Sequence, residues 1–444
     1  MKKLIQTLKN IWSIEELRSK ILFTLMLIVV YRIGSHIVLP GINPIILEQQ
    51  KGDASNGILD MINTFAGGAF NKASIFALGI MPYISASIFM QLMTVLVPKF
   101  QKMQKEGDSG RKKINQMTRY LTVLVTILQA SAYVTYLKQT ASLALITEYP
   151  FFWLSTTIIL TAGTLFVMWM GEKITDKGLG NGTSLIIMIG ILARLPQSFT
   201  QELVAKSNPA GHILIFIVEI VILIAIIMGC IILIQGVRKV PVNYAKQIVG
   251  NRQFGGARQF LPLKVNSAGV MPIIFAQAIM FLPTLITLGN ANRQTALNAM
   301  FTDHRNFGYM LIYSVVVIGF TFLYTALIFN PKQIAENLKQ NNGFIPGVKP
   351  GQPTADYIGN VMDKITFPGA IALAFIGILP GIANRLGVTQ GFSTFFGGTS
   401  LLIMVGVILD TLQQIETQLL MRQYDGLMKS GRIQGRQTTS AVQY

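Results

Sequence analysis

Residues 213–235 read ILIFIVEIVILIAIIMGCIILIQ, with Glu219 as the one charged side chain of the stretch. About 20 consecutive apolar residues are enough for a helix to cross the hydrocarbon core of a bilayer. The stretch also holds Cys230, the only cysteine of the chain, which excludes a disulfide within the chain. This segment predicts a membrane-spanning helix, and the rest of the chain is interpreted outward from it.

Nine further apolar stretches of similar character run through the chain. Charged residues make up 13% of the sequence, about half the share of about 25% that is usual in soluble domains. The sequence therefore predicts an all-α polytopic membrane protein with ten transmembrane helices, of which the fifth and ninth are short. The other nine expected spans are residues 21–38, 75–97, 117–137, 151–170, 183–195, 268–288, 309–330, 367–382 and 396–420.

Lysine and arginine are distributed unevenly between the two sets of loops. With the N-terminus placed in the cytoplasm, 28 of the 37 fall on the cytoplasmic side and eight on the other, and Arg32 lies within the first span. Such a bias is the positive-inside signature of multi-pass proteins. We expect a cytoplasmic-membrane protein with both termini in the cytoplasm, and the net charge of +18 is attributed to topology before any nucleic-acid partner.

The ten spans divide into two equal groups. Residues 1–20 are expected to form a cytoplasmic amphipathic helix, 21–197 the first five-span half, 211–420 the second half, and 421–444 a cytoplasmic tail. Because five is odd, the second half enters the membrane from the side opposite to the first. This arithmetic allows an inverted-topology pair with a site or a pore at its interface.

Two cytoplasmic loops, 236–265 and 331–366, are longer than the topology requires. The first begins with a Val/Tyr-rich run, continues through a Gly/Arg-rich part containing Gly255 and Gly256, and returns, which predicts a hairpin. The second contains PGVKPG at 346–351, a rigid turn presenting Lys349. Positive-inside anchoring explains the charge of these loops but not their length, so docking of an acidic or RNA-bearing partner is favoured.

The segment LDMINTFAGGAF at 59–70 is apolar and helix-like, but it is too short to span a membrane. A helix of this kind is either interfacial or tucked into a cavity, and composition alone leaves both interpretations open.

No catalytic constellation and no metal-binding cluster stands out in the sequence. GLGNG at 178–182 lacks the spacing of a nucleotide-binding loop and is expected to form the tight turn into the fifth span. Ionisable groups within the spans are few: Arg32, Glu219 without an evident partner, and Asp410 near a span end. This scarcity argues against an ion-coupled transporter.

Five motifs spread along the chain carry a family resemblance. KEGDSGRKK (105–113), IFALGIMPYISASI (75–88), GEKITDKGLGNG (171–182), LPLKVNSAGV (261–270) and GGTSLLI (397–403) closely resemble the SecY family of bacterial protein-translocation channels. The resemblance covers essentially the whole chain. It implies two inverted five-helix halves around a central pore, which conducts unfolded polypeptides across the bacterial inner membrane and releases hydrophobic segments sideways into the bilayer.

The resemblance also implies roles for particular residues. The apolar pore ring would consist of Ile80, Ile84, Ile187, Ile191, Ile274 and Ile403, and the spacing of 80/84 and 187/191 by one helical turn supports it. The segment 59–70 would be the plug, with Phe65, Gly67, Gly68 and Phe70. Polar residues of the lateral gate, which would open between spans two/three and seven/eight, would be Ser85, Gln91, Gln129 and Gln277.

Partners follow from the same resemblance: SecE, SecG, the ribosome, the motor ATPase SecA, the YidC insertase, membrane lipid, and secretory and membrane protein substrates, but no DNA. Arg252, Arg258 and Lys349 would contact partners; Lys349 stands where bacterial relatives usually carry an arginine important for SecA. No enzymatic activity and no cofactor are expected. The alternatives are a solute transporter with a five-plus-five repeat and an insertase with a hydrophilic groove in place of the ring.

Overall fold

Ten long helices make up most of the molecule, and each coincides with one expected span. The computed structural model describes residues 12, 14–49, 63, 65–140, 149–207, 213–244, 247–249, 252–254, 258–287 and 306–429. Most of the expected helix at 1–20 and the tail beyond 429 lie outside this part. The long helices are α2 (Glu15–Gly34), α5 (Met81–Leu96), α7 (Asp108–Thr140), α8 (Tyr149–Lys177), α9 (Gly182–Ser207), α10 (Ile213–Gln235), α11 (Met271–Thr287), α13 (Phe307–Ile328), α15 (Gln352–Arg385) and α17 (Gly398–Lys429).

Within the described residues, seven of these helices are long and apolar enough to cross a membrane by length and composition. An eighth span is obtained if α5 is joined to the short α6 (Pro98–Lys105), to which it is bent by 99°. The remaining two are less apolar or shorter, because α2 contains Arg18, Lys20 and Arg32 and α11 has 17 residues. Large apolar side chains of α10 such as Leu214 and Ile232 are exposed, as expected of a surface that faces lipid.

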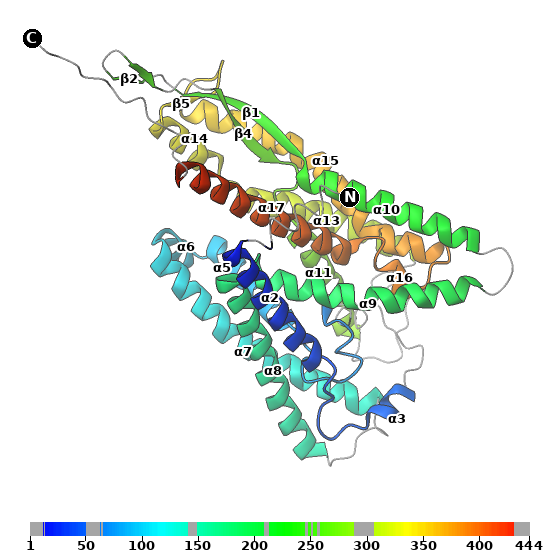
Figure 1. Cartoon of the computed structure of the whole chain (residues 1–444). Coiled ribbons are helices and arrows are strands. Elements are labelled where there is room, and N and C mark those ends of the chain that lie inside the picture. Colours follow the sequence, from blue (N-terminus) through cyan, green and yellow to red (C-terminus); the bar gives the residue numbers. More distant parts are fainter. Residues whose placement is uncertain are drawn as a thin grey trace, which may run out of the picture.

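The helices form two groups that follow the chain order. Figure 1 shows α2, α5, α7 and α8 together below and α10, α13, α15 and α17 together above, with α9 between them. One buried apolar cluster joins the groups: it contains Tyr31 of α2, Ile191 of α9 and Ile403 of α17. A separate cluster within the second group contains Tyr313, Leu373 and Leu402. Part of the interface between the halves is therefore a packed core, and the predicted two-half architecture is confirmed.

The second span begins later than the sequence predicted. Residues 75–80 form turns, and the helix begins at Met81, with Pro82 in its first turn, where the missing N–H of proline is tolerated. Gly79 has φ +54°, a conformation that favours glycine and separates the turns from the helix. The expectation of a helix from residue 75 was therefore wrong.

Several helices continue beyond their expected ends. Helix α9 passes through Pro196 to Ser207, so the separation of the halves expected near 198–210 is largely helical. Helix α15 begins at Gln352 and passes through Pro368 and Pro380. Together with α14 (Pro331–Gln340), it makes most of the expected loop 331–366 helical. The described residues also contain two short helices, α3 (Pro44–Gln49) and α16 (Gln390–Ser393).

The predicted hairpin between α10 and α11 is confirmed. Strand β1 (Val237–Tyr244) pairs antiparallel with β4 (Arg258–Lys264), and β5 (Gly343–Phe344) extends the sheet on the other edge of β1. Between them, β2 (Gln247–Val249) pairs antiparallel with β3 (Arg252–Phe254), and the expected tip at Gly255 and Gly256 lies outside the described residues. The hairpin projects past the helix ends on the same side as α6 (Figure 1).

The hairpin is packed onto the helices that follow it. Val240, Val242 and Leu263 share a buried cluster with Ile358 and Met362 of α15. Alternation of buried and outward residues along β1 fits a sheet with one face on a core and one in solvent.

Candidate functional site

A cavity of about 940 Å³ lies between the two groups of helices. Its lining comes from both halves and from the segment before α5, and it is mainly apolar. Four of the six predicted ring isoleucines line it (Ile84, Ile187, Ile274 and Ile403), together with Phe65 and all four predicted gate residues (Ser85, Gln91, Gln129 and Gln277).

The predicted ring residues lie close together, with one exception. Ile80, Ile187, Ile191 and Ile403 belong to the apolar cluster that joins the halves, and Ile84 packs against it. Ile80 is the residue just before α5, but its carbonyl still accepts a hydrogen bond from the Ile84 N–H at 3.1 Å. The one-turn spacing therefore holds although the helix begins later. Ile274 lines the cavity without belonging to this cluster.

The described part of segment 59–70 packs directly against the ring residues. Phe65 is buried in the same cluster as Ile80, Ile187 and Ile191. Residues 66–70 form turns, and Ala66, Ala69 and Phe70 are buried within the protein. Residues 59–62 and 64 lie outside the described residues.

Two glycines bring this segment against α9. Gly67 has φ +65°, and a Cβ atom at that position would lie 2.9 Å from the Cα of Gly190. A Cβ atom on Gly190 would in turn lie 2.7 Å from the carbonyl oxygen of Phe65. This close backbone contact is therefore possible only because both residues are glycine. On the other side, the Tyr133 hydroxyl donates to the Phe70 carbonyl at 2.6 Å.

The four predicted gate residues differ in what they contact. Gln91 accepts a hydrogen bond at 2.9 Å from the hydroxyl of Tyr324, which joins α5 of the first half to α13 of the second. Ser85 instead donates within its own helix to the Met81 carbonyl. Gln129 and Gln277 line the cavity, and Oε1 of Gln277 is buried without a hydrogen-bond partner among the described residues.

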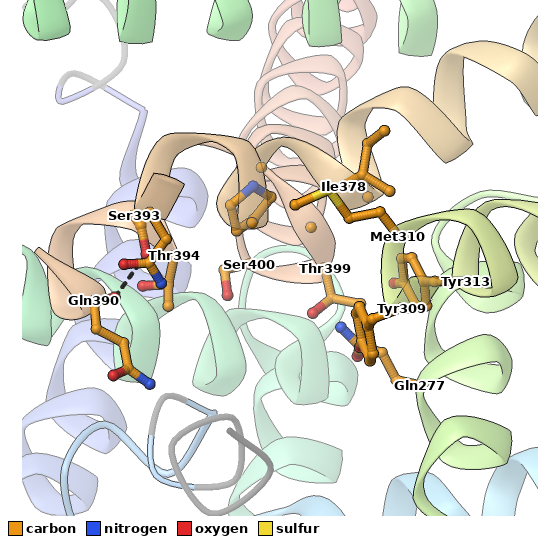
Figure 2. A pocket seen from close by; sticks show the side chains of 16 residues that line it. Gln277, Tyr309, Met310, Tyr313, Ile378, Gln390, Ser393, Thr394, Thr399 and Ser400 are labelled. Carbon is orange, nitrogen blue, oxygen red and sulfur yellow. Dashed lines mark hydrogen bonds between the residues drawn. The ribbon is translucent and has the colours of Figure 1, made fainter. Parts of the chain in front are cut away.

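A smaller cavity of about 100 Å³ adjoins the large one, and Gln277 and Tyr309 line both. Figure 2 shows Ser393, Thr394, Thr399 and Ser400 facing the same space as Tyr313 and Gln277. Tyr313 is buried and lines this cavity together with Gln277.

Glu219, expected to lack a partner, has one. Oε1 of Glu219 lies 3.2 Å from Nζ of Lys206, which also lies 3.7 Å from Oε1 of the buried Glu202. The other oxygen of Glu202 accepts hydrogen bonds from the backbone N–H and the hydroxyl of Thr389. This charged cluster ties the end of α9 to α10 and to the chain before α16. Among the described residues, no group of three or more His, Cys, Asp or Glu side chains could hold a metal ion.

The predicted turn at 178–182 is confirmed. Gly180 has φ +73°, and Asn181 Oδ1 accepts hydrogen bonds from the backbone N–H groups of Thr183 and Ser184 at the start of α9. The Gly180 N–H donates to Oε1 of Gln414 on α17. The glycine-rich stretch is thus a helix cap and a contact between the halves.

The predicted partner-contact residues all lie on the hairpin side of the molecule. Lys349 is exposed in the turn between β5 and α15, where Gly347 and Gly351 adopt positive φ. Arg252 begins β3 and Arg258 begins β4.

The comparison with protein families gives a match to the SecY family over residues 74–412, which is most of the chain. The chain belongs to the SecY family. It is 42% identical over 434 residues to the protein translocase subunit SecY of Mycobacterium tuberculosis, covering 93% of this chain and 97% of the relative. It is also 42% identical over 449 residues to the Corynebacterium glutamicum protein of the same name, covering 97% and 100%.

Solved structures share the fold at lower identity. A structure described as that of a protein conducting channel superposes with a TM-score of 0.61 at 17% identity, over 90% of this chain and 92% of the other. Sec61 in the canine ribosome–channel complex gives a TM-score of 0.56 at 15% identity, over the same shares. The SecY-family fold, with ten transmembrane helices in two inverted halves around a central pore, is therefore confirmed.

Sequence reasoning missed several residues that the structure places at the site. Tyr324 carries the hydrogen bond across the halves, and Gly190 and Tyr133 hold segment 65–70. Gly190 follows Ile187 by three residues on the ring-facing side of α9, which was the one available signal. For Tyr324 and Tyr133 the sequence offers none, because their partners are 233 and 63 residues away in the chain.

Proposed function

We propose that this SecY-family chain is the channel-forming subunit that passes unfolded polypeptides across the cytoplasmic membrane and releases hydrophobic segments sideways into the bilayer. One observation carries the proposal: an apolar cluster of ring isoleucines, with Phe65 against it, borders a cavity of about 940 Å³ that both halves line. A solute site of charged, unwound helices would favour a transporter, and a hydrophilic groove would favour an insertase. The apolar cluster supports a channel.

The six isoleucines act as the constriction of the pore. Apolar side chains exclude water and ions from a narrow passage by dewetting, yet they move aside for a polypeptide. Segment 59–70 acts as a plug that supports this seal in the resting channel. The burial of Phe65 among Ile80, Ile187 and Ile191 supports that role.

The lateral gate lies where α5 and α7 face α11 and α13. The hydrogen bond from Tyr324 to Gln91 supports this position, because it links the two sides directly. A nascent helix gains about 0.3–0.6 kcal/mol for each central Leu, Ile, Phe or Val that enters lipid, whereas a central Asp, Lys or Arg costs about 2.5–3.5 kcal/mol. A brief opening of the gate thus sorts apolar segments into the membrane and keeps polar ones in the pore.

Partners bind on the cytoplasmic side, where the hairpin 237–264 and the turn holding Lys349 project. The motor ATPase SecA and the ribosome dock there through Arg252, Arg258 and Lys349, while SecE and SecG brace the helices and YidC receives inserted segments. Both chain termini lie in the cytoplasm, which the positive-inside distribution supports. The ribosome complex described for the canine Sec61 relative, which shares the fold, is in keeping with this placement.

Reconstitution tests the proposal. Vesicles containing the chain with SecE and SecG, supplied with SecA and ATP, are expected to import a secretory precursor and protect it from added protease. Vesicles in which Ile84, Ile187 and Ile274 are replaced by Trp, which would overfill the constriction, serve as the blocked control. The proposal would be contradicted if the chain assembles with SecE but imports no precursor. It would also be contradicted if the Trp-substituted channel imports the precursor as well as the parent channel does.

A further inference from the structure

Arg32 carries a positive charge within the membrane-spanning helix α2, in its last turn. Its side chain is partly buried, and among the described residues no acidic side chain forms an ion pair with it. A cation in this position needs dipoles or water around it, because burial without them is costly. Part of that role falls to the C-terminal end of its own helix, whose dipole favours a cation.

The guanidinium also reaches the plug. Nη1 of Arg32 donates to the carbonyl oxygen of Gly67 at 3.4 Å, a long hydrogen bond. A Cβ atom at position 67 would lie 3.1 Å from this nitrogen and 2.9 Å from the Cα of Gly190. The turn at Gly67 is therefore held between the charge on α2 and the backbone of α9.

This contact lies beside the constriction. Gly190 directly precedes Ile191, and Phe65, two residues before Gly67, is buried among the ring isoleucines. The second polar tether of the segment, from the Tyr133 hydroxyl to the Phe70 carbonyl, is neutral and lies at the other end of the turns. Removing the plug from the ring would break the charged contact, while Gly68, whose Cβ would meet no atom within 4 Å, leaves room for movement between the two tethers.

We propose that Arg32 is a charged latch that holds the plug turn at Gly67 against α9 and so keeps the resting channel closed. This inference rests on the proposed function of segment 59–70 as a plug. Arg32 acts through the plug and does not itself form the seal, so it is a positioning residue. A role confined to the end of its own helix would leave the plug unaffected.

Bilayer recordings of the purified complex test the latch. Arg32→Gln removes the charge and is expected to raise the resting open probability about tenfold, the factor for losing about 1.4 kcal/mol of closed-state stability. Arg32→Lys keeps the charge but lacks the planar, multi-donor guanidinium group, so a smaller rise in the open probability is expected. Arg18→Gln makes the same charge change in the first turn of the same helix, far from the plug, and is expected to match the parent.

A second background separates the plug from the helix. In a channel lacking residues 59–70, Arg32→Gln is expected to add nothing, because both changes remove the same contact. The latch would be overturned if Arg32→Gln raises the resting open probability equally in both backgrounds, or does not raise it in the intact channel. If the deletion alone leaves conductance at the parent level, the plug function itself fails, and that result is distinguishable from failure of the latch.

Chemical labelling measures how accessible the plug is, and a change in the stability of α2 alone would not alter that accessibility. Ala66→Cys, in a Cys230→Ser background, places a thiol at a buried plug position. Adding Arg32→Gln is expected to speed its reaction with a membrane-impermeant maleimide about tenfold. If Arg32→Gln fails to assemble, the same labelling rate is measured with Arg32→Lys. Labelling at the rate of the parent channel, in whichever variant assembles, would contradict the proposal.

Discussion

Ile403 lies on α17 among Ile80, Ile187 and Ile191, with no polar group of its own to hold water. Ile403→Asn puts an amide of similar size into this constriction and lowers the barrier to water and ions. We expect a measurable resting conductance in bilayer recordings and relaxed selectivity for signal sequences. Ile403→Leu keeps an apolar side chain of the same volume and is expected to remain tight. If Ile403→Asn channels show the same resting conductance as the parent, the ring is misassigned.

The hydrogen bond between Tyr324 and Gln91 is a second feature at the scale of single residues. Tyr324→Phe removes the donor and Gln91→Leu the acceptor, and each is expected to weaken the closed gate by about 1 kcal/mol. Export of a precursor with a weakened signal sequence should rise about fivefold in either variant. The double variant is expected to match the single ones, because the same bond is lost, and additive effects would argue against a shared contact.

The ring isoleucines were assigned through the family resemblance, and only the one-turn spacing of the pairs 80/84 and 187/191 is a local pattern. The structure brings these four residues together with Ile403. The sequence missed Tyr324 and the partner of Glu219, because both depend on which helices meet. Ser85 was grouped with the gate by its position, but its hydroxyl bonds to its own helix backbone.

At the scale of elements, the cluster of Glu202, Lys206 and Glu219 joins α9 and α10, the helices that connect the halves. The side chains of Glu202, Lys206 and Glu219 are 0%, 11% and 7% exposed. Lys206→Met leaves two buried carboxylates without their cation and is expected to destabilise the protein by about 3–5 kcal/mol. Thermal unfolding in detergent measures the loss.

Two further variants control this experiment. Lys177→Met removes an exposed lysine and is expected to leave the unfolding temperature unchanged. The triple variant Lys206→Met, Glu202→Gln and Glu219→Gln removes the uncompensated charge and is expected to recover much of the stability. An unfolding temperature of Lys206→Met equal to the parent would mean that the carboxylates gain nothing from the lysine.

The positions of the helices followed from apolar length, but their ends did not. Helix α15 continues through Pro368 and Pro380, and α9 through Pro196, because neighbouring helices support backbone groups that a proline leaves unpaired. In α5 the effect is the opposite: Pro82 marks the start of the helix, and apolar residues before it form turns. Apolar composition shows that a segment is buried or in lipid, not that it is helical.

At the scale of the whole molecule, the odd number of spans and the charge bias allowed two inverted halves with a site or a pore between them, whereas the lining of the cavity depends on which helices meet. The hairpin and the turn holding Lys349 lie on the side of the molecule that we propose faces the cytoplasm. Arg252→Glu, Arg258→Glu and Lys349→Glu are each expected to weaken binding of ribosomes or SecA to the complex while leaving its folding intact. Ribosome binding is also expected to weaken steeply with salt. Parent affinity of all three variants across a salt series would leave these charges as topology determinants only.

The central claim is that a polypeptide crosses the membrane through the cavity at the isoleucine ring. A photoreactive amino acid at Ile274 or Ile403, with a precursor stalled during SecA-driven import, measures this directly. We predict covalent adducts with the precursor at both positions and none at Leu214, which is 72% exposed on α10 and faces lipid. Adducts at Leu214, or none at the ring while import proceeds, would contradict the account.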